Sequence, residues 1–185
     1  DRPLFGALLR ALPIGLLMLV WRRVLPPAGW RLRTLVLGML NIGLFFPLIY
    51  LSAYNLPGGL AATVQALLPM VVMVVAYLLL RERPTVFRVA GAVIGFAGVA
   101  LLVLGTTTGV TALGLAAAAG SVLCTALGSV LTKRWQPPVD MVTLVSWQLV
   151  VGGLFLLPVA LVVEGAAPRL DAAALAGYLW IGVLG

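Results

Sequence analysis

Long apolar runs separated by short polar connections dominate the chain. Six of these runs occupy residues 4–21, 34–54, 60–80, 89–104, 110–132 and 141–163. A seventh opens near Ala172 and is still apolar at Gly185. A helix needs about 20 apolar residues to cross the ~30 Å hydrocarbon core of a bilayer. Because the runs are continuously apolar rather than alternating, they favour helices over the strands of a transmembrane barrel. The pattern predicts an all-α integral membrane protein with six spans and part of a seventh.

Composition excludes a water-soluble fold. Of the 185 residues, 63% are hydrophobic and 9% are charged, and the mean hydropathy is +1.18. Soluble domains have about 45–50% apolar and about 25% charged residues. The chain has no histidine and one cysteine, Cys124, so neither an internal disulfide nor a Cys/His zinc site is expected. We predict no metal and no cofactor. Without histidine or an acid–base pair at membrane depth, we also expect no enzyme activity.

Charge alternates from one connection to the next. Nine of the twelve basic residues lie in the first, third and fifth connections: Arg22, Arg23, Arg31, Arg33, Arg81, Arg83, Arg88, Lys133 and Arg134. The second and fourth connections carry no charge. By the positive-inside rule the basic connections face the cytoplasm, which puts residue 1 on the outer side. The net charge of +7 therefore indicates topology and not a nucleic-acid partner.

A weak internal repeat has a shift of 139 residues. Residues 38–43 (GMLNIG) recur as 177–182 (GYLWIG), and the same shift carries Asp1 onto Asp140. Five spans separate equivalent positions, and because five is odd the two copies run in opposite directions. Inverted repeats are typical of secondary transporters. With a five-helix unit, residues 1–104 are helices 2–5 of the first repeat and 105–185 are helices 6–8 of the second, the last incomplete. The chain is then expected to be part of a longer protein.

Three motifs in the first half belong together. They are residues 59–69 (GLAATVQALLP), 80–85 (LRERPT) and 91–98 (GAVIGFAG), the last continuing as Gly-Val-Ala-Leu-Leu. Over residues 30–104 this combination resembles the drug/metabolite transporter superfamily, and specifically the EamA-type exporters. The resemblance implies ten helices in two inverted five-helix repeats that move small metabolites by alternating access.

These observations predict a secondary transporter that exports small metabolites, either amino acids or drug-like compounds. Its partners would be the small-molecule substrate, the lipid bilayer and a second copy in a homodimer. The alternatives are a channel-like pore and a non-transporting membrane scaffold. No predicted span contains Asp or Glu, which favours a facilitator or exchanger over a proton-coupled carrier. An Ala/Leu/Gly/Val-rich composition with more Arg than Lys suggests a bacterial inner membrane.

Gln65 is the first candidate substrate-binding residue. It lies four residues before Pro69 within a predicted span. Since proline has no amide N–H, the carbonyl of Gln65 loses its usual partner and a kink is expected there. Discontinuous helices are where transporters place their sites, so we predict that Gln65 contacts substrate. The alternative is a hydrogen bond to a neighbouring helix.

Asn41, Trp147 and Gln148 are further mid-span candidates for substrate binding. Trp147 and Gln148 lie six to seven residues into their span, or ~10 Å at 1.5 Å per residue. That depth is greater than the depth at which a tryptophan anchors to lipid headgroups, so Trp147 is expected either to pack within the protein or to stack on a ligand.

Arg10 is the other candidate and the one charge well inside a predicted span. It must either extend to the outer interface or point into the cavity, where it would attract an anionic group.

Two stripes of residues run along the predicted span 110–132. Small residues recur every four positions and predict close helix packing: Ala116, Gly120, Cys124 and Gly128. Beside them, Ser121, Thr125 and Ser129 either face a polar cavity, with Thr125 as a substrate contact, or bond the carbonyls four residues earlier. Gly91 and Gly95 predict another packing face. Glu82, between two arginines, is expected to have a structural role at a helix junction.

Overall fold

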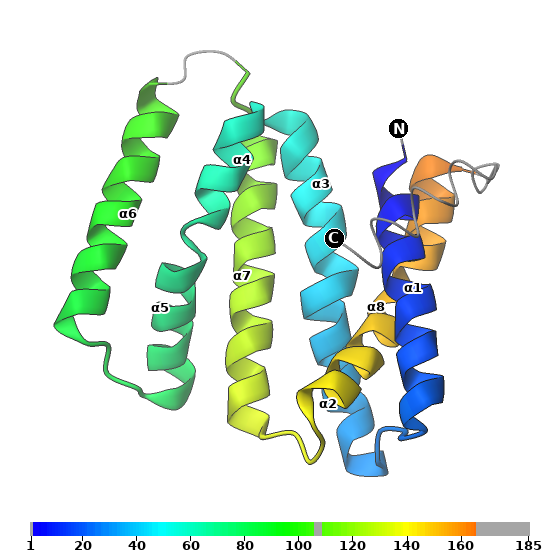
Figure 1. Cartoon of the computed structure of the whole chain (residues 1–185). Helices are drawn as coiled ribbons and strands as arrows, with labels where there is room; N and C mark the ends of the chain where they lie inside the picture. The colour runs from blue at the N-terminus through cyan, green and yellow to red at the C-terminus, as the bar shows by residue number, and fades with distance from the viewer. Residues whose placement is uncertain (1, 106–108, 166–185) are drawn as a thin grey trace. The chain divides into compact units, whose positions relative to one another are not determined.

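The structure is a computed structural model that describes residues 2–105 and 109–165 (Figure 1). Regular structure in these residues is helical throughout. The stretches long and apolar enough to cross a membrane are Pro3–Arg22, Ala28–Asn55, Gly59–Leu80, Ala112–Trp135 and Met141–Glu164. A further apolar helix, α6 (Val86–Gly105), covers the predicted run 89–104. The six predicted runs are thus confirmed as helical, and the seventh lies outside the described residues.

Packing divides the chain into two compact units. Of the described residues, one unit contains 2–46 and 137–165, and the other contains 47–105 and 109–136. This division reflects contacts, whereas the predicted boundary at residue 104 concerns sequence repeats and stays a prediction. The second copy of the predicted repeat, at 177–182, lies outside the described residues.

In the first unit, α8 (Met141–Glu164) packs against α1 (Pro3–Arg22) and against the span that follows it. That span begins with a short 3-10 turn, η1 (Ala28–Trp30), and continues as α2 (Arg31–Gly38). Glycines let the backbones approach closely. A Cβ added to Gly15 would lie 2.8 Å from the Cβ of Leu149, and one added to Gly38 would lie 2.8 Å from the Cβ of Val151. Small residues at the contact permit this geometry.

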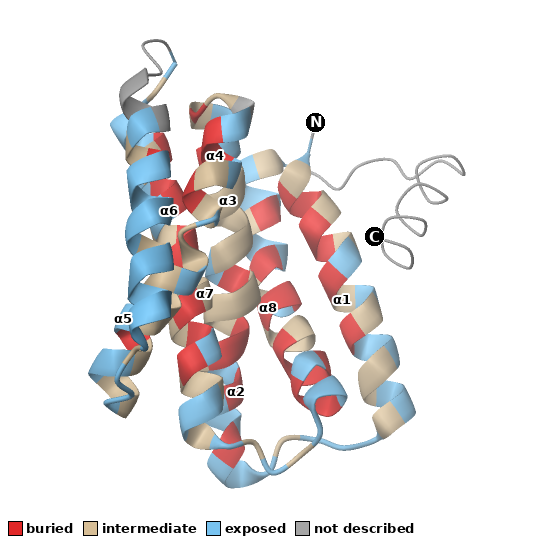
Figure 2. Ribbon diagram, turned by 60° about the vertical axis from the view of Figure 1, so that its left-hand side comes forward, coloured by how far each residue is buried: buried red, intermediate tan, exposed pale blue. Residues whose placement is uncertain are grey.

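In the second unit, α7 (Ala112–Trp135) packs against α4 (Gly58–Gln65) and α5 (Leu68–Leu80). Most of α3 (Phe45–Asn55), from Pro47 onward, also belongs here. Figure 2 shows buried residues along α7, while α6 is largely exposed. The apolar core of this unit has two parts. The larger part contains Leu56, Leu60, Ala61, Val64, Val99, Ala118 and Val122. The smaller part contains Val75, Ala126 and Val130.

Of the two predictions about small residues, the one for Gly91 and Gly95 needs correction, and the one for the stripe on α7 is tested only at Gly120. The close backbone approach of α7 lies at Gly114, where an added Cβ would be 2.8 Å from the backbone oxygen of Asn55. At Gly120, in the predicted stripe, the nearest atom would be a methyl of Leu48 at 3.4 Å, an ordinary contact. Gly91 and Gly95 were expected to pack, yet an added Cβ would meet nothing within 4 Å at either position. The small face of α6 therefore borders open space.

In the described residues, α-helical geometry is interrupted in the interior of two spans, each time at a predicted site residue. Between α2 and α3 the chain forms a π-helical stretch, η2 (Met39–Leu44), which contains Asn41. Between α4 and α5 the helix breaks at residues 66–67, directly after Gln65, as Pro69 predicts. Single π-helical turns inside α-helices are frequent at functional sites. Both interruptions place a carboxamide where the backbone departs from a regular helix.

Candidate functional site

In the first unit, Asn41 and Gln148 form a direct pair. The Nδ2 of Asn41 donates to the Oε1 of Gln148 at 2.7 Å. Gln148 is 7% exposed, and Asn41 is half-buried. The π-helical turn carries Asn41 toward α8, so two predicted site residues from distant parts of the sequence meet. Each amide keeps further donors and acceptors beyond this bond.

The side chain of Trp147 is buried and bonds to the backbone of the protein itself. Its side chain is 2% exposed, and its Nε1 donates to the backbone oxygen of Val24 at 2.7 Å. An indole has a single N–H donor, and this bond employs it. Of the two interpretations for Trp147, the structure supports packing: the ring anchors the connection after α1 to α8. Its assignment as a substrate contact stays a prediction that requires the buried ring to become accessible to a ligand.

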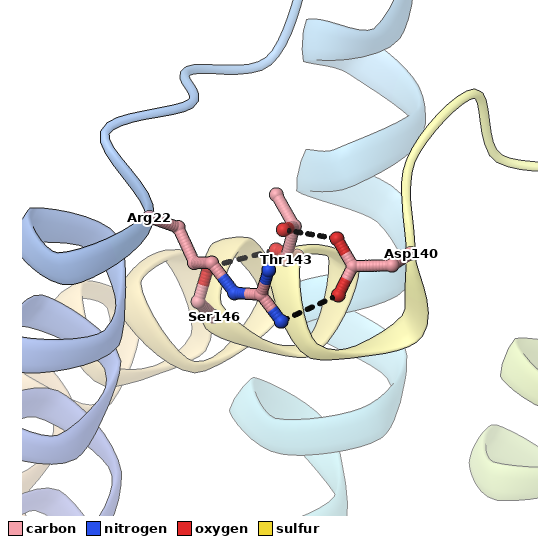
Figure 3. A network of polar contacts seen from close by, with 4 residues as sticks. All are labelled: Arg22, Asp140, Thr143 and Ser146. Atoms are coloured by element: carbon pink, nitrogen blue, oxygen red, sulfur yellow. Dashed lines mark hydrogen bonds and ion pairs between the residues drawn. The ribbon is translucent and has the colours of Figure 1, made fainter.

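A polar network of Arg22, Asp140, Thr143 and Ser146 lies where the end of α1 meets the start of α8 (Figure 3). Arg22, the last residue of α1, pairs with Asp140 at 3.0 Å. Asp140 also accepts a hydrogen bond of 2.6 Å from the hydroxyl of Thr143, and Ser146 donates to the carbonyl of Thr143 at 2.7 Å. The hydrogen bond from Thr143, together with the charge of Arg22, lowers the pKa of Asp140 below its ordinary value of 3.8. The network ties the end of α1 to the start of α8.

The lowered pKa of Asp140 predicts how its stabilising effect depends on pH. A carboxyl group whose pKa is lower in the folded state contributes stability above its unfolded pKa and loses it as the pH falls through the folded pKa. Asp140→Asn should therefore lower the thermal midpoint in detergent by the same amount at pH 7 and pH 5. That difference should close below pH 3.8, the ordinary value. A difference that disappears between pH 7 and pH 5 would contradict the assignment.

In the second unit, Gln65 bonds to α7. Its Nε2 donates to the Oγ of Ser121 at 2.7 Å, and that hydroxyl in turn donates to the carbonyl of Ala118 at 2.7 Å. The predicted alternative, a bond to a neighbouring helix, is thus present. Thr125 and Ser129 donate to the carbonyls four residues earlier, at 3.1 and 2.8 Å. This confirms the local-bonding interpretation for both hydroxyls, while a contact between Thr125 and substrate stays a prediction.

A cavity of about 600 Å³ lies within the second unit, between α5, α6 and α7. Its inner end is lined by Ala66, Leu67 and Pro69, which are the residues of the helix break and its proline. The hydroxyl-bearing residue Ser129 also lines it. Its other end is bordered by charged residues, among them Lys133. The helix interruption beside Gln65 therefore opens onto a space of the size typical of small-molecule sites, about 300–1,000 Å³.

Glu82 has the structural role expected of it. Lys133, near the end of α7, pairs with both carboxylate oxygens of Glu82 at 2.6 and 2.7 Å. The pair links the connection between α5 and α6 to α7. Because both side chains are exposed, it contributes little to stability, about 0–1 kcal/mol.

Arg10 lies on the exposed side of α1 and has no ion-pair partner among the described residues. The two predicted alternatives for Arg10 both require an exposed guanidinium, so both stay open.

Glu164 makes a structural contact that the sequence did not predict. Its two oxygens accept hydrogen bonds from the backbone N–H groups of Leu4 and Phe5 at 2.7 and 2.9 Å. Glu164 is the last residue of α8, so a helix expected to end at residue 163 instead ends on an acid. Its place directly after an apolar run was the available signal, but the bond to α1 depends on the fold.

Comparison with known families agrees with this helical, apolar architecture. The EamA-like transporter family matches residues 2–104. The chain belongs to that family. The resemblance to the drug/metabolite transporter superfamily is thereby confirmed. As a member of the EamA-like family with several apolar helices, the chain is a multi-pass membrane protein.

Relatives of this EamA-like chain include proteins of bacteria and an archaeon. Protein PecM of Dickeya dadantii is 40% identical over 187 residues, which cover 100% of this chain and 63% of that protein. An uncharacterized transporter of Bacillus subtilis, YvbV, is 35% identical, covering 84% and 52%. An uncharacterized transporter of Archaeoglobus fulgidus is 26% identical, covering 68% and 45%. The chain thus spans about half to two thirds of the length of these curated relatives. No solved structure gives a significant match.

Proposed function

We propose that the full protein is a secondary transporter that exports small metabolites, amino acids or drug-like compounds, by alternating access. It would lie in a bacterial inner membrane with residue 1 on the outer side and would assemble as a homodimer. Membership of the EamA-like family supports the transporter class, and the relatives named as transporters agree with it.

The observation that carries the proposal is the helix break after Gln65. A break at membrane depth frees backbone groups that a regular helix would pair, and transporters place their substrate sites at such breaks. Here the break directly follows the carboxamide of Gln65, which does not line the cavity between α5, α6 and α7. The Nε2 of Gln65 is held by Ser121 at 2.7 Å, which leaves the amide oxygen free to accept a hydrogen bond from substrate. The pair Asn41 and Gln148 supplies a second set of amide groups.

Counterflow in proteoliposomes tests this proposal. The full-length protein would be loaded with unlabelled amino acids or small cationic drugs, and uptake of the labelled compound would be measured. Gln65→Ala should reduce uptake up to about tenfold, because one hydrogen bond to substrate is worth about 0.5–1.5 kcal/mol.

Ser121→Ala is the matched control for Gln65. It removes the same interhelical bond but leaves the carboxamide of Gln65 in place. If Gln65 contacts substrate, Ser121→Ala should retain most of the uptake. If both variants lose uptake equally, Gln65 only joins two helices and is not a substrate contact. Absence of counterflow with every compound, from folded protein, would count against the transporter.

A further inference from the structure

The cavity between α5, α6 and α7 combines an apolar body with a basic mouth. One wall begins at Ala66 in the helix break and continues along α5 through Met70 and Met73 to Ala76. Across from that wall lie Gly91 and Gly95 of α6, where an added Cβ would meet nothing within 4 Å. These residues offer no charged group, so the body of the cavity suits a hydrocarbon chain.

The length of α5 is close to that of one leaflet of a bilayer. The helix has 13 residues, from Leu68 beside the break to Leu80 at the basic end, and therefore spans about 18 Å at a rise of 1.5 Å per residue. The hydrocarbon core is ~30 Å thick, so one leaflet provides about 15 Å. An acyl chain lying along α5 from the headgroup level would therefore end near the helix break.

The mouth of the cavity carries an excess of positive charge. Arg83, Arg88, Lys133 and Glu82 all border it. Glu82 is neutralised by Lys133, with which it forms an ion pair. Neither Arg83 nor Arg88 has an ion-pair partner among the described residues. Two guanidinium groups thus remain at the opening, and guanidinium binds phosphate oxygens in a bidentate manner.

We propose that this cavity is a binding site for an anionic phospholipid, with an acyl chain against α5 and α6 and the phosphate at Arg83 and Arg88. Basic pockets between membrane helices on the cytoplasmic side recognise anionic headgroups in this way. The site goes beyond the proposed transport function and draws on the proposed orientation only for the choice of the cytoplasmic leaflet. The exposed surface of α6, visible in Figure 2, gives a lipid access from the bilayer.

Native mass spectrometry of the delipidated full-length protein tests the site. Dioleoyl phosphatidylglycerol, dioleoyl phosphatidylcholine and glycerol phosphate would be titrated separately. We expect phosphatidylglycerol to bind more tightly than phosphatidylcholine, and glycerol phosphate alone not to bind. Equal binding of the two lipids, or binding of glycerol phosphate as tight as that of phosphatidylglycerol, would overturn the proposal.

Variants assign the binding to this cavity. Arg83→Gln and Arg88→Gln should each weaken binding of phosphatidylglycerol about fivefold, since one cation at the surface contributes about that factor. The matched control is the pair Arg31→Gln and Arg134→Gln, exposed residues that do not line the cavity. These should leave the binding unchanged, and an equal loss would indicate a nonspecific surface effect and overturn the site.

Filling the cavity gives an independent readout. Gly95→Leu places a side chain in open space, so it should fold normally yet displace the acyl chain and abolish binding. If binding persists in folded Gly95→Leu, the lipid lies elsewhere and the proposal fails. Lipid binding is read without transport, so a failed counterflow experiment and a failed lipid site remain distinguishable.

Discussion

Gly152→Ala is expected to destabilise the protein by about 1–3 kcal/mol, and Gly152→Leu to prevent folding. A Cβ on Gly152 would contact the Cβ and Cγ2 of Ile42 and would lie 2.9 Å from the backbone oxygen of Gly38. A backbone oxygen cannot turn aside as the end of a flexible side chain can. The π-helical stretch and α8 would therefore have to separate, and the bond between Asn41 and Gln148 would weaken with them.

Gly98→Ala is the control for Gly152→Ala, because an added Cβ at Gly98 meets nothing within 4 Å. It should be neutral or slightly stabilising, since alanine favours a helix over glycine by about 1 kcal/mol. Free energies of unfolding from denaturant titration in detergent micelles compare the two variants. Equal stability of the two would show that α8 does not pack through Gly152.

The helical spans were predictable because their signal is local. Each run is continuously apolar over the length that a bilayer requires, and nothing outside the run is needed to recognise it. The break after Gln65 was predictable for the same reason: the missing N–H of Pro69 acts on the carbonyl four residues earlier, whatever surrounds it.

The contacts between spans were not predictable in this way. Gly91 and Gly95 have the same spacing as glycines that pack, but spacing does not say whether another helix lies opposite. Likewise, the sequence contains Asn41 and Gln148, yet their bond depends on a π-helical turn that rotates one of them toward α8. The predicted contacts of Gln65, Thr125 and Arg10 with substrate stay predictions for the same reason: a ligand's position is set by several helices at once.

Glu164→Ala is expected to lower the free energy of unfolding by about 2–3 kcal/mol. The carboxylate accepts the N–H groups of Leu4 and Phe5, which lie in the first turn of α1 and have no partner within the helix. Both residues are buried, at 6% and 3% exposure, so water reaches these donors poorly once the acceptor is gone. An unpaired buried donor costs about 1–3 kcal/mol.

Glu164→Gln separates hydrogen bonding from the rest of the side chain. It keeps one acceptor oxygen and replaces the other with an NH₂ group. This NH₂ group faces a backbone N–H and cannot accept a hydrogen bond from it, so about half of the loss in stability is expected.

The control is Glu82→Ala, which removes an exposed carboxylate from the ion pair with Lys133 and should cost less than 1 kcal/mol. Denaturant titration of the variants in detergent would rank them. If Glu164→Ala were no more destabilising than Glu82→Ala, the carboxylate would not be holding the end of α8 to the start of α1. In that case Glu164 would be a free carboxylate at the end of a span. The expectation of a facilitator or exchanger rests on spans without acidic residues. Proton-driven uptake would then have to be measured to test that expectation.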